Sequence, residues 1–253
     1  MDLPKNRFKA ALKEGRSQIG LWNTIGGNTV PELLGGAGFD WVLVDCEHSA
    51  IETIEVLTAL QAIGQVPETS AIVRPATNDP TLFKRLLDMG AQTLLVPYVQ
   101  SAAEAETAVR AMRYGPQGMR GMAGMTRATR YGQVRDYYNR AEEELCLIVQ
   151  VETIAALEHL EAIATTDGVD GVFIGPADLS ASMGLRGQVN HPDVVSVIEG
   201  AFDTLKRLNV PIGIMALNPE DAKRYIALGA TMTAVGVDLV LLADSIAALR
   251  ATF

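Results

Sequence analysis

Residues 145–152 read LCLIVQVE, and residues 172–180, beyond a helix-like segment, read VFIGPADLS. Each stretch begins with apolar residues of the kind found in strands that are buried on both faces of a parallel sheet. Each also reaches a carboxylate, Glu152 in the first and Asp178 in the second. Because neighbouring parallel strands end at the same edge of a sheet, we expect Glu152 and Asp178 to lie side by side where such sheets bind ligands.

Strand and helix patterns alternate along the rest of the chain. Six further strand candidates flank the two runs, at residues 18–23, 40–45, 71–74, 93–97, 210–215 and 232–237. Helix starts lie between them, marked by capping boxes or by an N-cap residue before proline, at Ser49 to Glu52, Asp79-Pro80, Ser101 to Glu104 and Asn218-Pro219. Apolar spacing predicts further helices at about 6–13, 154–164 and 239–250.

This alternation predicts an α/β fold built on a parallel sheet. The chain has 253 residues, close to the roughly 250 of an eight-fold barrel, and closing the sheet leaves no exposed edge. No internal repeat, low-complexity tract or linker indicates a second domain. We therefore predict a TIM (β/α)8 barrel, a single domain over residues 1–253.

Composition narrows the range of partners. The formal net charge is −9, which opposes binding to nucleic acid, because neutralising phosphates dominates that affinity. No apolar run approaches the roughly 18 residues of a membrane span, and no secretory signal follows Met1, so we expect a cytoplasmic protein without a membrane partner. Cys46 and Cys146 lie in strand-like runs without CxxC spacing, where a thiol usually behaves as a small hydrophobe.

One long segment, residues 113–143, does not fit the short loops of a compact barrel. Segments of this length are usually functional or interfacial. For any single arginine in it, a solvated surface role is an equal alternative. Its arginines are Arg113, Arg120, Arg127, Arg130, Arg135 and Arg140.

Glu152 and Asp178 supply only hard oxygen donors. Such ligands, with room left for water and a chelating substrate, suit Mg²⁺ or Mn²⁺ better than zinc, and Co²⁺ is a further candidate. The alternative is that each carboxylate only caps the helix that follows it. Two carboxylates on consecutive strands, one of them after Gly175-Pro176, favour the metal.

Other strand ends add polar residues that a barrel would direct to the same mouth. The candidates are Asp45 and His48 after the second strand, Arg74 at the end of the third, and Gln150 in the fifth, with Trp22 in the first as a further substrate-binding candidate. Each has a structural alternative, such as a surface ion pair for Arg74. His48 differs from His159 and His191 because it follows a strand end beside acidic residues that could orient it or raise its pKa.

These residues provide the parts needed to stabilise the enolate of a 2-oxo acid: a divalent metal, a cation and a base. The turn Gly175-Pro176-Ala177-Asp178 opens a helix whose free N–H groups could bind the carboxylate of that acid. No lysine ends a predicted strand, which disfavours a Schiff-base aldolase.

The sequence resembles the metal-dependent class II pyruvate aldolases typified by 4-hydroxy-2-oxoheptanedioate aldolase, the HpcH/HpaI aldolase family, which is related to citrate lyase β subunits. The resemblance covers nearly the whole chain. It is carried by the motifs at residues 45–48 (DCEH), 73–75 (VRP), 86–92 (LLDMGAQ), 113–114 (RY), 118–121 (GMRG), 150–152 (QVE) and 174–180 (IGPADLS).

The resemblance implies a role for each matched residue. It makes Glu152 and Asp178 the metal ligands, and it assigns binding of the 2-oxo acid to Gln150 and to the backbone at Ala177 and Asp178. It further makes His48 the proton acceptor, whose basicity Asp88 raises, and Arg74 the group that stabilises the enolate.

Two features depart from the expected pattern. Our barrel places Asp88 at the far end of the third helix, so it would act on the site of a neighbouring subunit unless the helix boundary lies elsewhere. The family commonly has Arg-Tyr-Pro-Pro where this chain has Arg113-Tyr114-Gly115-Pro116, which affects loop geometry and acceptor choice. Members are typically homo-oligomers, often hexamers, which suits the arginine-rich segment as an interface.

We therefore expect a lyase that cleaves a 4-hydroxy-2-oxo acid to pyruvate, or a close 2-oxo acid, and an aldehyde, through an enolate that a divalent metal stabilises. The reaction should be reversible. One alternative is a lyase of the same superfamily acting on a CoA thioester, for which no nucleotide-binding motif is visible. Another is a non-catalytic barrel that serves as a binding protein.

Overall fold

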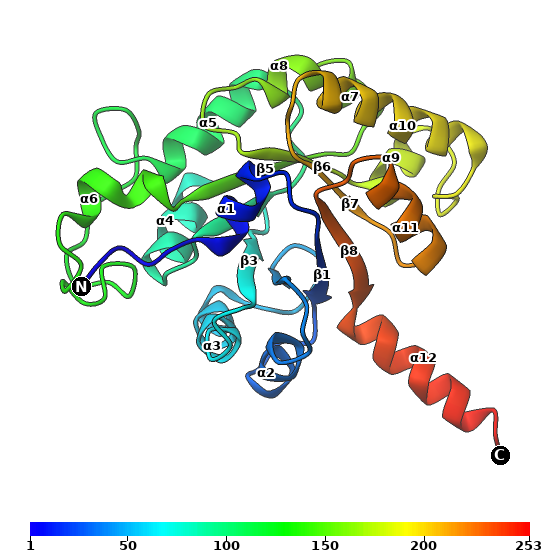
Figure 1. The fold of residues 1–253 in the computed structure, drawn as a ribbon, viewed down its shortest axis with the longest axis horizontal. Helices are drawn as coiled ribbons and strands as arrows, with labels where there is room; N and C mark the ends of the chain where they lie inside the picture. Colours follow the sequence, from blue (N-terminus) through cyan, green and yellow to red (C-terminus); the bar gives the residue numbers. More distant parts are fainter.

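Eight parallel strands pair in chain order into a closed barrel in the computed structural model, which describes residues 1–253 (Figure 1). The last strand pairs with the first, as predicted. The strands are β1 (Gln18–Asn23), β2 (Trp41–Asp45), β3 (Ser70–Arg74), β4 (Thr93–Val96), β5 (Cys146–Val151), β6 (Gly171–Ile174), β7 (Ile212–Met215) and β8 (Met232–Val237).

Apart from α12, the helices cover the outside of this barrel and its amino-terminal end. They are α1 (Arg7–Lys13), α2 (Thr29–Gly35), α3 (Thr53–Ile63), α4 (Pro80–Asp88), α5 (Ala102–Met112), α6 (Tyr137–Arg140), α7 (Ile154–Leu157), α8 (Leu160–Ala164), α9 (Pro176–Ser182), α10 (Pro192–Arg207), α11 (Pro219–Ala227) and α12 (Asp238–Arg250), with a 3-10 helix at Ala141–Glu143. None of them combines the length and apolar character that a membrane span requires.

Most predicted helix starts are confirmed, and one is wrong. The side chains of Asp79, Ser101 and Asn218 each accept a hydrogen bond from the first turn of the following helix. The capping box predicted at Ser49 to Glu52 lies three residues too early, because Glu52 itself is the N-cap of α3 and pairs reciprocally with Glu55. Ser49 instead donates its hydroxyl to the carbonyl of Asp45, which builds the turn after β2.

The helix predicted over residues 154–164 is two short helices, α7 and α8, that meet at Glu158 and His159. The helix predicted to open at Gly175-Pro176 is confirmed as α9, whereas the sequence pattern did not reveal α2 or the length of α10. A helix in a barrel is stabilised mainly by packing its apolar face on the sheet, so its local sequence signal can be weak.

Side chains along each strand alternate between two layers. On β5, Cys146 and Ile148 join an apolar cluster inside the barrel, while Leu147, Val149 and Val151 join the larger cluster between barrel and helices. The inner cluster is Phe8, Leu12, Trp22, Trp41, Leu43, Ile72, Leu95, Cys146, Ile148, Phe173, Met232 and Ala234. The two-residue period of a strand produces this division.

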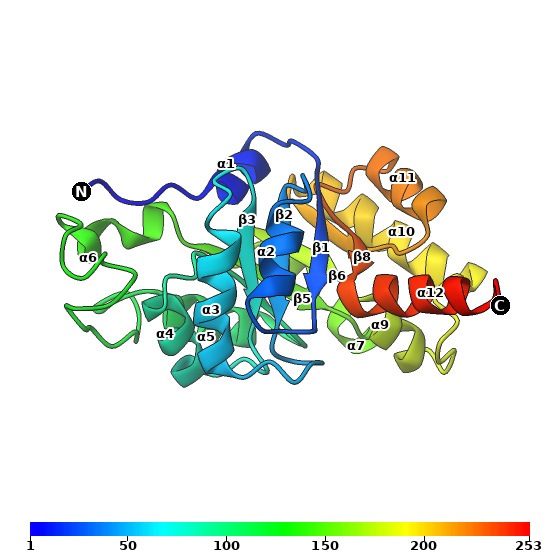
Figure 2. The ribbon, with the colours of Figure 1, turned by 90° about the horizontal axis from the view of Figure 1, so that it is seen from below.

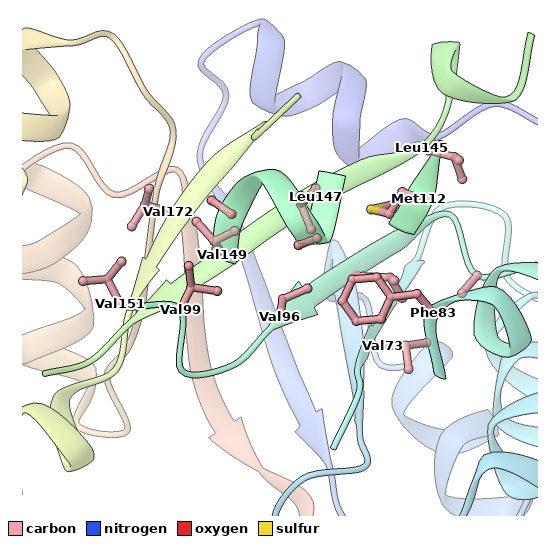
Figure 3. Close-up of a cluster of buried hydrophobic side chains, with 14 of the residues drawn as sticks. Val73, Phe83, Val96, Val99, Met112, Leu145, Leu147, Val149, Val151 and Val172 are labelled. Atoms are coloured by element: carbon pink, nitrogen blue, oxygen red, sulfur yellow. The ribbon is translucent and has the colours of Figure 1, made fainter. Parts of the chain in front are cut away.

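The two layers are closed differently. In the outer layer, Figure 3 shows Val73, Val96 and Leu147 from the strands beside Phe83 of α4 and Met112 of α5. The inner layer is closed at the amino-terminal end of the barrel by Phe8 and Leu12 of α1, which Figure 2 shows at the opposite end from α9. The carboxyl ends of the strands therefore remain the open mouth.

The arginine-rich segment, residues 113–143, is held largely by contacts within the chain. Arg113 pairs with Asp167 and Glu142, at 2.9 and 3.1 Å, and Arg140 pairs with Glu143. The side chain of Arg120 has no exposed surface and lies 2.8 Å from Asp88. These contacts account for three of the six arginines without a partner subunit, and the predicted interface role of the segment stays a prediction.

The last helix, α12, leaves the barrel after β8 and projects away from it (Figures 1 and 2). Asp238, its first residue, is buried, whereas residues 239–253 are all exposed. The exposed side chains include Leu239, Leu241, Leu242, Ile246 and Leu249. In other βα units of the barrel the helix packs back on the sheet. Because α12 does not, it leaves the outer face of the barrel beside β8 uncovered within this chain.

Candidate active site

A cavity of about 490 Å³ opens at the carboxyl ends of the strands. It brings together every predicted site residue except Asp45 and Asp88. The predicted residues that line it are Trp22, His48, Arg74, Gln150, Glu152, Gly175, Pro176, Ala177 and Asp178. They come from the carboxyl ends of β1, β2, β3, β5 and β6, so their convergence follows from closure of the sheet.

Arg74 is fixed by two carboxylates at the end of β3. Its Nε and Nη2 donate to the two oxygens of Asp45, both at 2.7 Å, and its Nη1 lies 2.8 Å from Glu47. The guanidinium also lies over the ring of Trp22, 5.2 Å from the ring centre. A guanidinium has five N–H donors, so those not bonded to Asp45 remain for a ligand in the cavity.

Asp45 holds Arg74 and also shapes the turn that carries His48. It is fully buried, and its Oδ1 accepts a bond of 3.0 Å from the backbone N–H of Glu47. Burial would raise the pKa of Asp45, but the bonds and the charge of Arg74 outweigh it and lower the pKa. Asp45 stays ionised and out of reach of a substrate, which favours a positioning role over the direct catalytic role predicted for it.

His48 stands at the rim of the cavity, with its side chain about two-thirds (66%) exposed. Its Nε2 lies 3.8 Å from Glu47, the same carboxylate that faces Arg74. An exposed imidazole beside a carboxylate can accept a proton from a ligand and pass it to water.

Glu152 lies on the cavity wall just beyond β5. Its Oε1 accepts a bond of 2.9 Å from the backbone N–H of Tyr98, and its Oε2 is in contact with the Nε2 of Gln150. Tyr98 adopts a left-handed backbone conformation, with φ of 55°, that directs this N–H. Gly175 gives the carboxylate space, because a Cβ there would lie 2.4 Å from Oε2.

The pKa of Glu152 is raised to about 7, chiefly by burial; the nearby charges of Asp178 and Glu47 add to this shift, and the bonds from Tyr98 and Gln150 oppose it. The Oε1 of Gln150 is buried without a hydrogen-bond partner. Clustered negative charge and an unpaired oxygen fit a bound cation. No group of three or more His, Cys, Asp or Glu side chains could hold an ion, so two carboxylates would need oxygens from a substrate or water.

Asp88 is not part of this cavity. It is the last residue of α4, as expected, and α4 runs back from the mouth to the amino-terminal end of the barrel. There it forms its ion pair with Arg120. Within one chain Asp88 cannot reach His48, and its predicted effect on that histidine would require a second subunit.

A second wall of the cavity was not predicted from the sequence. It consists of the loop before α10, the end of β7 and the first turns of α11, and its residues are Val189, Asn190, Met215, Ala216, Leu217, Asn218, Asp221 and Tyr225. Asn218 gave a signal only as a helix cap. The local sequence does not show whether a polar residue in the first turn of a helix faces the mouth of the barrel or the solvent.

The model of the HpcH/HpaI aldolase/citrate lyase family matches residues 18–245, which contain all of these cavity residues. The chain belongs to the HpcH/HpaI family. A pyruvate aldolase of Rhizobium etli is 54% identical over 100% of this chain and 99% of its own length. A 4-hydroxy-2-oxo-heptane-1,7-dioate aldolase of Escherichia coli is 50% identical over 98% of this chain and 95% of its own.

A solved structure shows the same fold in this family. The HpcH/HpaI family protein of Burkholderia cenocepacia superimposes with a TM-score of 0.93 at 36% identity, over 98% of this chain and 99% of that one. Membership in the HpcH/HpaI family and the aldolase relatives make this protein an enzyme, a carbon–carbon lyase. The alternative of a non-catalytic barrel is thereby set aside.

Proposed function

We propose that this enzyme cleaves 4-hydroxy-2-oxo acids to pyruvate, or a close 2-oxo acid, and an aldehyde, with a divalent metal, and catalyses the reverse addition. The observation that carries the proposal is the convergence of Glu152, Asp178, Arg74 and His48 on one cavity. In cleavage, the 4-hydroxyl loses its proton, the C3–C4 bond breaks, and its electron pair remains on C3 as an enolate. C3 then takes up a proton to give pyruvate.

Glu152 and Asp178 would hold the metal, Mg²⁺, Mn²⁺ or Co²⁺. Bound there, the ion would act as a Lewis acid toward the 2-oxo acid. Gln150 and the backbone at Ala177 and Asp178 would position that acid. The N–H donors of Arg74 that are not bonded to Asp45 would stabilise negative charge on the reacting oxygens. His48 would accept the proton of the hydroxyl, which its exposed position at the rim permits.

Exchange of the methyl protons of pyruvate in D₂O, without an aldehyde, tests this function directly. We expect the wild-type enzyme to exchange them with Mg²⁺, Mn²⁺ or Co²⁺ and to stop in EDTA. His48→Ala should exchange more slowly by roughly 10²–10⁴-fold at saturating pyruvate, because general-base catalysis is lost. His159→Ala, a change within the segment between α7 and α8, is the matched control.

Two results would contradict the proposal. Full exchange in a demetallated sample would exclude the metal, and equal exchange by His48→Ala would move His48 to a role in orienting the aldehyde. Cleavage of a panel of 4-hydroxy-2-oxo acids, followed by pyruvate release, then defines the substrate. A CoA thioester lyase would release no pyruvate from any of them.

We further propose that the enzyme is a homo-oligomer, a hexamer by its resemblance to the family. Within one chain Asp88 is remote from His48, so its proposed effect on that histidine requires a second copy of the chain. The exposed apolar surface of α12 supports association between copies.

A further inference from the structure

The charged residues that line the cavity also affect which aldehydes can bind beside the 2-oxo acid. This inference rests on the proposed function. The 2-oxo acid would occupy the side of Glu152, Asp178 and Arg74. The aldehyde must approach its methyl carbon, so the rest of the aldehyde extends toward the second wall, formed by Val189, Asn190, Met215, Ala216, Leu217, Asn218, Asp221 and Tyr225.

This second wall carries one charged residue, Asp221, and no cation. Arg224, one turn after Asp221 on α11, does not line the cavity. Its Nη1 lies 2.9 Å from Glu199, its Nη2 lies 3.7 Å from Asp221, and its guanidinium covers the ring of Tyr225 at 4.5 Å. One positive charge is therefore shared by two carboxylates, which leaves the wall negative.

The opposite side of the cavity offers no free cation either. Arg74 lies within 2.8 Å of both Asp45 and Glu47, so two carboxylates already face its single positive charge. Its N–H donors that are not bonded to Asp45 are assigned to the reacting oxygens. The helix N-terminus beside the second wall, that of α11, already holds Glu220 and Asp221 in its first turn.

We infer that the second wall selects an uncharged aldehyde and discriminates, through Asp221, against one with a distal carboxylate. A carboxylate brought to this wall meets a like charge and finds no partner, which costs binding energy. A hydroxyl group in the same position can donate to Asp221. The acceptors that fit are therefore short neutral aldehydes, in particular hydroxylated ones.

Two acceptors that differ by one negative charge and one methyl group test this inference: succinic semialdehyde and its methyl ester. Addition of pyruvate to each is measured as kcat/KM at saturating pyruvate. For the wild-type enzyme we expect the ester to be preferred by roughly tenfold, the scale of one like-charge contact at a partly solvated site. In Asp221→Asn the preference should fall by at least about threefold, through a gain for succinic semialdehyde.

Glu220→Gln is the matched control. Glu220 precedes Asp221 on α11, is exposed, pairs with Lys223 at 2.8 Å and does not line the cavity. It should leave the preference unchanged. A purely structural effect of Asp221→Asn would lower kcat/KM for both acceptors together and leave their ratio as in the wild type, which would overturn the inference.

Deuterium exchange into pyruvate tests the proposed function without any aldehyde, so it distinguishes a failure of that function from a failure of this inference. An enzyme that exchanges yet prefers succinic semialdehyde retains the proposed function and overturns the inference, because a cation from outside this chain must then reach the wall. An enzyme that does not exchange overturns both.

Discussion

Arg74 is held by Asp45 and Glu47 in a planar geometry that an ammonium group cannot reproduce. We expect Arg74→Lys to lower kcat by roughly 10² or more, the scale of losing one preorganised donor to a developing oxyanion. Steady-state cleavage kinetics measure this, with the circular dichroism and melting temperature of the variant as the control for folding. A kcat near that of the wild type would make Arg74 a structural residue.

Glu152 links the site to the stability of the metal-free protein. Its pKa is raised from 4.5 to about 7, so its contribution to stability is complete below about pH 4.5 and is lost as the pH rises through about 7. The free energy of unfolding of the metal-free wild-type protein should therefore increase as the pH is lowered from 8 to 5.5. The full effect of such a shift is about 3 kcal/mol.

Glu152→Gln removes that charge and should lose this pH dependence, so that in EDTA it is more stable than wild type at pH 8. It should lose metal affinity without unfolding. The amide of Gln150 can rotate so that its unpaired Oε1 accepts from the new side chain. Thermal unfolding in EDTA at both pH values, at one protein concentration, checks this, and parallel pH profiles of the two proteins would contradict it.

At the scale of elements, Asp238 ties the end of β1 to the start of α12. Its carboxylate accepts from the side chain of Asn23 at 2.8 Å, from the backbone and hydroxyl of Thr24 at 2.7 to 3.0 Å, and from the N–H of Ile25 at 3.1 Å. The β1–β8 pairing ends at Trp22 and Val237, and the side chain of Asp238 continues the connection between the two elements just beyond it.

Asp238→Ala leaves these donors unpaired at a buried position, and we expect it to lower the free energy of unfolding by at least about 2 kcal/mol. Asp244→Ala, on the exposed part of the same helix, should change it by less than about 0.5 kcal/mol. Urea or thermal unfolding of the two variants side by side measures the difference. Equal stability of both would show that water replaces the bonds to Asp238.

At the scale of the whole molecule, α12 exposes apolar side chains that a monomer would leave in water. Leu242, Ile246 and Leu249 share one face of the helix, and their exposed fractions are 49%, 58% and 64%. We expect copies of the chain to bury this face against one another. Size-exclusion chromatography with light scattering should show an oligomer for the wild-type protein.

Ile246→Lys places a charge in the middle of this face and should shift the protein to smaller assemblies. Ala247→Lys adds the same charge at an exposed position on the other side of the helix and is the matched control. A monomeric wild-type protein, or an assembly that Ile246→Lys does not change, would show that α12 does not mediate association.

The sequence by itself determined the barrel and most of its mouth. Eight apolar runs alternate with helix signals, and a parallel strand between helices has few other arrangements at this length. Closure then brings strand ends together, so Arg74, Gln150, Glu152 and Asp178 could be placed in one site before any contact was known. These features depend on period and order along the chain, which are local properties.

Only the tertiary structure decided which groups meet across the barrel. Examples are the hydrogen bonds between Asp45 and Arg74, the hydrogen bond from the N–H of Tyr98 to Glu152, and the position of Asp221 in the second wall. In each case two distant segments meet, and neither local sequence indicates the contact. The same holds for α12, whose composition predicts a helix but not that it leaves the barrel. Such contacts follow from loop paths and packing, because their energies belong to pairs of distant residues rather than to any one stretch of sequence.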